Sequence, residues 1–110
     1  MSGLRPVLEE LKGNERFKRL LPGRPVTAGM KSGYVVLKPG ESVGEHKTES
    51  REEGIIILEG SAEIIVEGER MFTARKENLI YIPPETSHDI KNISDEPLRY
   101  VYVVVPTEKG

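Results

Sequence analysis

Short apolar runs separated by turn residues are the feature that most limits what this chain can fold into. From Met30 to Val105 such runs are interrupted roughly every eight to twelve residues by Gly, Pro, Asn or Asp. No stretch of this region has the length and periodicity of a long helix. We therefore predict an all-β domain, either a sandwich or a barrel. The expected strands are Met30–Leu37, Ser42–Thr48, Ile55–Leu58, Ala62–Val66, Arg70–Ala74, Leu79–Ile82, Ser87–Ile93 and Leu98–Val105.

Two Glu-Gly pairs mark expected tight turns. Glu59-Gly60 and Glu67-Gly68 each stand between two predicted strands, and glycine readily adopts the positive φ that two-residue hairpin turns require. The sequence therefore predicts a hairpin at each pair.

The first 27 residues differ from the rest and form an expected N-terminal arm. Val7, Leu8 and Leu11 lie on one helical face, which predicts a turn or two of helix ending at Gly13. Arg16–Leu21 is a candidate short strand before a Pro- and Gly-rich break. We thus divide the chain into an arm, residues 1–27, and a barrel, residues 28–110.

Composition excludes several classes of protein. The 110 residues suffice for one domain, and without cysteine neither disulfides nor a thiolate metal site can form. A net charge of -2 disfavours nucleic-acid binding, which needs a basic surface. No apolar run approaches the roughly 18 residues of a membrane span, and no signal peptide is recognisable, so we expect a cytoplasmic protein. The lack of cysteine and glutamine, with 31% charged residues, favours a thermophilic source.

Two predicted strands are apolar on both faces. Ile55–Leu58 and Val101–Val105 break the usual alternation, so both sides of the sheet must be covered there. One face fills the barrel, and the other meets either the chain's own first 25 residues or a second copy. We expect a homodimer formed through sheet packing, because an exposed apolar face of this size promotes aggregation.

The two histidines stand where strands would place them inside the barrel. Side chains alternate along a strand, so His46 and Thr48 can face inward together, as can His88 and Asn92. Imidazoles combined with one carboxylate suit Fe, Mn, Ni or Zn as a divalent ion and leave positions open for a small-molecule ligand. Composition does not choose the carboxylate. The nearby candidates are Glu45, Glu49, Glu52 and Glu53.

Four other polar residues are candidates for the wall of this cavity. Thr48 is expected to be a pocket residue or a hydrogen-bond donor behind the ligands, and Asn92 to secure a turn or strand end near the pocket. Tyr100 and Tyr102 share one face of the last strand, so they either line the cavity or lie in a subunit interface.

Two segments of the chain resemble the two sequence motifs of the cupin family. The first reads Gly40, five residues, His46-Lys47-Thr48, four residues, Glu53, six residues and Gly60. The second reads Glu77, five residues, Pro83-Pro84-Glu85, two residues, His88, three residues and Asn92. The resemblance covers residues 28–105 and implies a jelly-roll barrel, or double-stranded β-helix. It also implies that His46, Glu53 and His88 hold a divalent metal inside that barrel.

Three positions depart from the family pattern. Thr48 replaces the second histidine of the first motif, which leaves either a three-ligand site with open positions or a weakened site. Glu77 and Glu85 replace two turn glycines of the second motif, and we expect their turns to avoid positive φ.

The resemblance implies two alternative functions. The first is a metal-dependent enzyme of the oxygenase, isomerase or decarboxylase type that acts on a small oxygenated metabolite. The second is a non-catalytic cupin that binds a sugar or another small metabolite. A DNA-associated regulator is disfavoured, because these residues contain no recognition helix.

Overall fold

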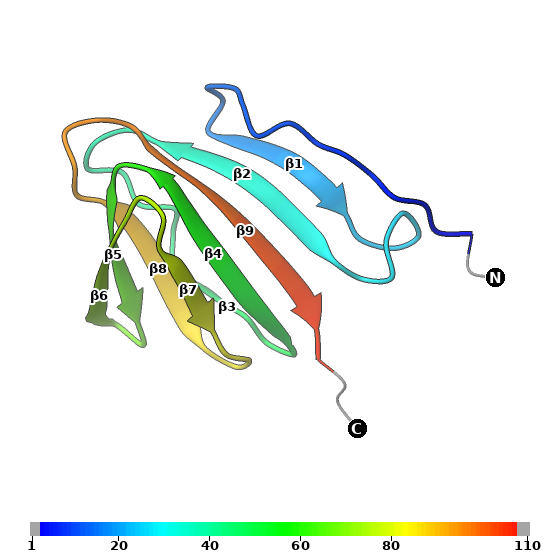
Figure 1. Cartoon of the computed structure of the whole chain (residues 1–110). Coiled ribbons are helices and arrows are strands. Elements are labelled where there is room, and N and C mark those ends of the chain that lie inside the picture. The colour runs from blue at the N-terminus through cyan, green and yellow to red at the C-terminus, as the bar shows by residue number, and fades with distance from the viewer. Residues whose placement is uncertain (1–2, 108–110) are drawn as a thin grey trace.

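Two antiparallel β-sheets packed face to face make up the computed structural model, which describes residues 3–107 (Figure 1). The larger sheet has the strand order β1-β2-β9-β4-β7, and the smaller sheet has the order β3-β8-β5-β6. The strands are β1 (Phe17–Pro22), β2 (Lys31–Leu37), β3 (His46–Lys47), β4 (Arg51–Glu59), β5 (Ser61–Val66), β6 (Glu69–Arg75), β7 (Leu79–Ile82), β8 (Ser87–Asn92) and β9 (Leu98–Pro106).

The predicted all-β fold of the double-stranded β-helix type is confirmed. From β2 to β9 successive strands alternate between the two sheets, except for the hairpin of β5 and β6, as they do in a jelly roll. Two strands differ from the prediction by more than one residue at an end. The strand expected over Ser42–Thr48 is reduced to β3 and one isolated bridge between Ser42 and Lys91. Strand β4 begins at Arg51 rather than Ile55, so it brings four further residues into the larger sheet.

The main core lies between the sheets. On β4 the side chains of Ile55 and Ile57 are buried, whereas Ile56 between them is 42% exposed, as expected when side chains alternate across a sheet. Each buried side chain of this size contributes about 1.5–3 kcal/mol by leaving water. The buried residues of this core are Val35, Leu37, Ile55, Ile57, Ala62, Ile64, Ala74, Ile80, Ile82, Ile90, Leu98 and Tyr100.

The outer face of the larger sheet is covered only in part. Leu20, Tyr34 and Val101 form a second buried cluster on β1, β2 and β9. Arg99, on the same face, donates hydrogen bonds to the Gly13 carbonyl (2.8 Å) and to Asn14 (2.7 Å), which holds the arm against the sheet. Figure 1 shows the arm running beside β1, at the edge of the larger sheet.

The helix expected in the arm does not form. Residues 3–14 have no regular secondary structure, and Val7, Leu8 and Leu11 remain 50%, 86% and 48% exposed. An isolated helix of one or two turns is unstable because its nucleation costs more than its few hydrogen bonds return. The strand expected over Arg16–Leu21 does form, as β1. Since no helix occurs anywhere in residues 3–107, that range contains none able to span a membrane.

The turns depart from the prediction in two ways. Glu67-Gly68 joins the paired strands β5 and β6 and is the expected hairpin, with φ of 52° and 81°. Glu59-Gly60 is not a hairpin, because β4 and β5 belong to different sheets. The expectation for Glu77 and Glu85 was also wrong. Their φ values are 75° and 57°, so both turns keep the left-handed conformation without glycine, at about 1–2 kcal/mol each.

Candidate metal centre

Strands β3 and β8 place the two histidines side by side at one end of the smaller sheet. His46 and His88 are direct partners in the antiparallel ladder, and their ring centroids are 4.2 Å apart with planes tilted by 59°. His88 is buried, whereas His46 is exposed because β3 is short and lies at the edge of the sheet. The site is therefore open to solvent on the His46 side.

The third member of the site comes from the opposite sheet. Glu53 on β4 is 5% exposed, and its Oε1 lies 3.0 Å from Nε2 of His88. One ligand atom from each of His46, Glu53 and His88 lies within 4.8 Å of the other two. Three atoms at these separations can meet one ion at bond lengths of about 2.0–2.2 Å.

The neighbouring carboxylate of Glu52 is used elsewhere. It lies on the other face of β4 and accepts a hydrogen bond of 2.7 Å from the hydroxyl of Tyr81. That hydrogen bond raises the pKa of Tyr81 above its usual value of 10.0. Strand alternation thus separates the roles of two adjacent glutamates.

Both imidazoles are oriented with one nitrogen towards the centre. Nδ1 of His46 lies 3.1 Å from the Gly44 carbonyl oxygen, and Nδ1 of His88 lies 3.3 Å from the Thr86 carbonyl oxygen. A proton on each Nδ1 satisfies these carbonyls and leaves each Nε2 with a lone pair. This arrangement, with a backbone acceptor behind the ring, is usual for metal-binding histidines.

Nε2 of His88 is the one buried side-chain polar atom in residues 3–107 without a hydrogen bond. Although Oε1 of Glu53 is close, the contact lacks hydrogen-bond geometry, so a lone pair of each atom faces the same space. Buried polar groups rarely lack a partner. A cation between these atoms would satisfy both, so the residues present fit a divalent metal.

The electrostatics of His88 are consistent with this fit. Burial lowers its pKa, but the Glu53 carboxylate, the Thr86 carbonyl and the Asp89 carboxylate together outweigh burial, and the net pKa lies above the usual 6.5. The carboxylate therefore favours positive charge at Nε2, whether it comes from a proton or from a metal ion.

Thr48 is buried, and its hydroxyl is occupied by the backbone. It donates to the Pro83 carbonyl (2.8 Å) and accepts from the Thr86 amide (3.0 Å), so it ties the segment after β3 to the turn before β8. Those two bonds leave no free proton to donate into the cavity. The candidate centre therefore offers three protein groups that could hold a metal.

Asn92 is fully buried and lies outside the cavity lining. Its amide nitrogen donates to the carbonyls of Leu37 and Glu96, and its oxygen accepts from both the amide and the hydroxyl of Ser94. Ser94 and Glu96 lie in the turn between β8 and β9, and Leu37 ends β2. Asn92 therefore supports the turn that precedes β9.

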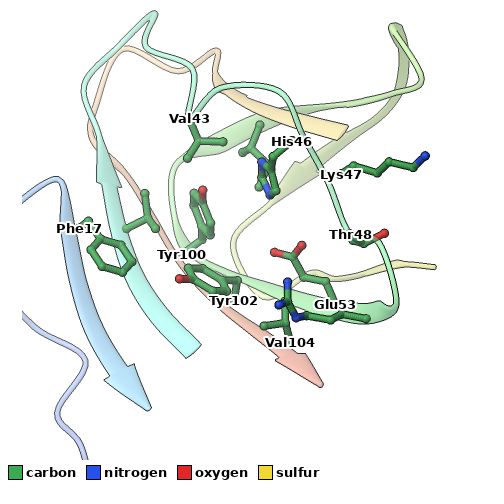
Figure 2. Close-up of a pocket in the computed structure, with 12 residues that line it drawn as sticks. Phe17, Val43, His46, Lys47, Thr48, Glu53, Tyr100, Tyr102 and Val104 are labelled. Carbon is green, nitrogen blue, oxygen red and sulfur yellow. The ribbon is translucent and has the colours of Figure 1, made fainter. Parts of the chain in front are cut away.

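A cavity of about 280 Å³ opens beside the candidate metal centre, and His46 and Glu53 line it (Figure 2). Tyr100 and Tyr102 both line it. Burial raises the pKa of both phenols, strongly so for Tyr100, and Glu53 adds to each effect. The lining residues are Phe17, Val35, Val43, His46, Lys47, Thr48, Arg51, Glu53, Ile90, Tyr100, Tyr102 and Val104.

Among the lining residues that sequence reasoning missed are Phe17 and Arg51. Arg51 stands two residues before Glu53, so strand alternation would have placed both on one face had β4 been extended to its true start. Phe17 had no comparable signal, because β1 reaches the cavity only through its pairing with β2.

Comparison with known proteins agrees with this architecture. A curated relative from Streptomyces cyaneus, named "Polyketide synthase CurC", is 34% identical over 85 residues, which are 74% of this chain and 54% of that protein. The chain spans about half the length of the curated relatives it matches.

Solved structures show the same fold. A Cupin 2 conserved barrel domain protein from Salinispora arenicola is 31% identical, with a TM-score of 0.70, over 92% of this chain and 86% of that chain. A Bacillus halodurans protein has a TM-score of 0.79 at 16% identity, over 96% of this chain and 85% of its own, which supports the fold alone. The family model described as a cupin domain matches residues 33–105. The chain therefore belongs to the cupin family.

Proposed function

We propose that His46, Glu53 and His88 bind one divalent transition metal, and that the chain is a metal-dependent enzyme acting on a small oxygenated metabolite. The observation that carries the proposal is the convergence of three ligand atoms within 4.8 Å, with Nε2 of His88 buried and lacking a hydrogen bond. With three protein ligands, a bound metal keeps positions open at which it polarises an oxygen of the substrate.

The chain's own groups would bind and orient that substrate. Apolar side chains on both sheets restrict water, which strengthens the electrostatic interactions inside the cavity. The hydroxyls of Tyr100 and Tyr102 stay protonated at neutral pH and supply hydrogen bonds to substrate oxygens. The name of the Streptomyces cyaneus relative supports a substrate related to polyketides, whose alternate carbons bear oxygen in the manner of a diketone.

A non-catalytic cupin that binds a sugar or another small metabolite is the second candidate. Thr48 favours it, because the hydroxyl that stands in the place of a histidine already bonds the backbone and adds no ligand to the centre. A three-ligand centre holds metal less firmly than a four-ligand one.

Elemental analysis of the protein purified without chelating resin tests the first candidate. We expect close to one transition metal per chain, lost in His88→Ala and Glu53→Gln and kept in the matched variant Glu52→Gln. The adjacent glutamate makes a precise control, because its carboxylate binds Tyr81 on the other face. Equally low metal in all four proteins would refute the enzyme proposal and leave the non-catalytic one.

We also propose that the chain forms a homodimer through the outer face of the larger sheet. Ile56, Leu79 and Tyr81 on β4 and β7 are 42%, 73% and 58% exposed and lie on one face of paired strands. A second copy of the same face would cover these apolar side chains in a self-complementary contact.

A further inference from the structure

The polar groups that face the cavity, apart from the metal-site residues, are almost all hydrogen-bond donors. The hydroxyls of Tyr100 and Tyr102 and the guanidinium of Arg51 have no hydrogen-bond or ion-pair partner within residues 3–107. Both tyrosine hydroxyls are accessible from the cavity, so they can donate to a bound ligand. Three unpaired donors around one cavity indicate a ligand rich in acceptor oxygens.

Arg51 is the cation of this lining whose charge is not neutralised. It lies on the inward face of β4, two residues from Glu53, and forms no ion pair among the residues described. Lys47, the other lining cation, is 3.8 Å from Glu85. Nearby Arg19 lies over the Phe17 ring, 6.0 Å from its centroid. The free charge at Arg51 is therefore suited to an anionic group on the ligand.

One wall of the cavity is flat and aromatic. The rings of Phe17 and Tyr102 are stacked, with centroids 6.4 Å apart and planes inclined by 18°. Gly33 lies beneath them on β2, where a methyl group would sit 2.6 Å from Phe17 and 2.7 Å from Tyr102. Its missing side chain lets both rings lie close against the strand. Figure 2 shows Phe17 and the two tyrosines on one side of the cavity, with Lys47 and Thr48 on the other.

We propose that this cavity binds a small aromatic oxyanion, with its ring against Phe17 and Tyr102 and its charged oxygens towards Arg51 and the tyrosine hydroxyls. The inference rests on the proposed function for its site and narrows the substrate to one chemical class. A flat apolar wall selects a planar ring, and a cluster of donors selects an oxyanion over a neutral group.

Three matched probes test the two halves of the proposal by calorimetric titration of the metal-free protein. Benzoate carries both features, cyclohexanecarboxylate keeps the charge without the planar ring, and benzamide keeps the ring without the charge. We expect benzoate to bind roughly 3- to 10-fold more tightly than cyclohexanecarboxylate. We expect it to bind at least about 10-fold more tightly than benzamide. Equal affinities, or no binding of any probe, would overturn the proposal.

Two variants assign the preference to residues. Arg51→Met should reduce the benzoate-to-benzamide ratio to about one, whereas Arg75→Met, which removes the same charge from β6 in the other sheet, should leave it unchanged. An unchanged ratio in Arg51→Met would refute the role of Arg51. The wild-type titration stands without the variants, should either fail to fold.

Failure of this inference is distinguishable from failure of the proposed function. Because the titration uses metal-free protein, its outcome does not depend on metal uptake. A chain that takes up metal yet shows no probe preference loses only the ligand assignment. A chain that prefers benzoate yet takes up no metal retains the ligand class and loses the metal-dependent activity.

Discussion

Replacing Gly33 by alanine should distort the aromatic wall of the cavity. The new methyl group would lie 2.6 Å from Cε1 of Phe17, 2.7 Å from Cε2 of Tyr102 and 2.8 Å from its hydroxyl oxygen. Carbon atoms pack best at about 3.5–4.0 Å, so both rings must move by an appreciable fraction of an ångström. Gly33 does not have a positive φ, so the destabilisation comes from this crowding rather than from strain of the folded backbone.

The size of the effect follows from how freely the rings can move. Overpacking costs about 1–3 kcal/mol, and the lower part of this range is expected because Phe17 is 45% exposed and Tyr102 borders a cavity. For a domain of this length, 1 kcal/mol lowers the melting temperature by about 4 °C. We therefore expect Gly33→Ala to melt about 4–8 °C below the wild type.

Gly54→Ala is the matched control for this experiment. Gly54 also lies in a strand, but the nearest atom to its added methyl group is 3.9 Å away, an ordinary contact. Alanine there restricts the unfolded chain and should stabilise the protein by about 0.4–1 kcal/mol.

Thermal and urea denaturation of both variants measure the difference. The loss in Gly33→Ala should also shrink in a Tyr102→Ala background, where two of the three close contacts are gone. If Gly33→Ala were as stable as Gly54→Ala, the described contact between the rings and β2 would be refuted.

Three further predictions concern hydrogen bonding, assembly and pH. Thr48→Val should destabilise the fold by about 1–3 kcal/mol in urea denaturation, because it leaves the Thr86 amide and the Pro83 carbonyl unpaired. Thr107→Val is the control, because the hydrogen bond of its hydroxyl is exposed. Equal losses of stability in the two variants would contradict the account. The wild type should be a dimer by light scattering, and Leu79→Glu should be a folded monomer, because it places a charge in the exposed apolar face. A monomeric wild type would contradict the proposed assembly. Glu52→Leu should lower the raised pKa of Tyr81, so its phenol ionises at lower pH in an ultraviolet titration, and an unchanged midpoint would refute the Tyr81–Glu52 bond.

The strands were predictable because each needs only local information. Alternation of apolar and polar side chains, with Gly and Pro between the runs, located the strands after Met30 to within a few residues in most cases. The helix expected in the arm was predicted wrongly, because Val7, Leu8 and Leu11 match a helical period over too few residues to offset the cost of helix nucleation. Periodicity reports which face is apolar, and it does not report whether that face has anything to pack against.

The site was predictable only in part because its geometry is not local. Residue types and spacing identified His46 and His88 as a pair, but the choice of Glu53 over Glu52 came from the family motif. The structure supplies the physical reason, since β4 turns one carboxylate inward and the other towards Tyr81. Arg51 was missed because the expected strand began four residues too late.

The positive φ of Glu77 and Glu85 also escaped prediction. Glycine is favoured at such positions, so its absence suggested a different turn. The surrounding strands impose the left-handed conformation all the same. Residue preference is a weak guide where pairing on both sides determines the turn.

Anomalous X-ray diffraction from crystals soaked in manganese or cobalt is the most direct test of the central claim. We predict one strong peak between the two sheets, about 2.0–2.2 Å from Nε2 of His46, Nε2 of His88 and a carboxylate oxygen of Glu53. No peak at full soaking, or a peak bound by other residues, would contradict the claim that these three side chains form a metal centre.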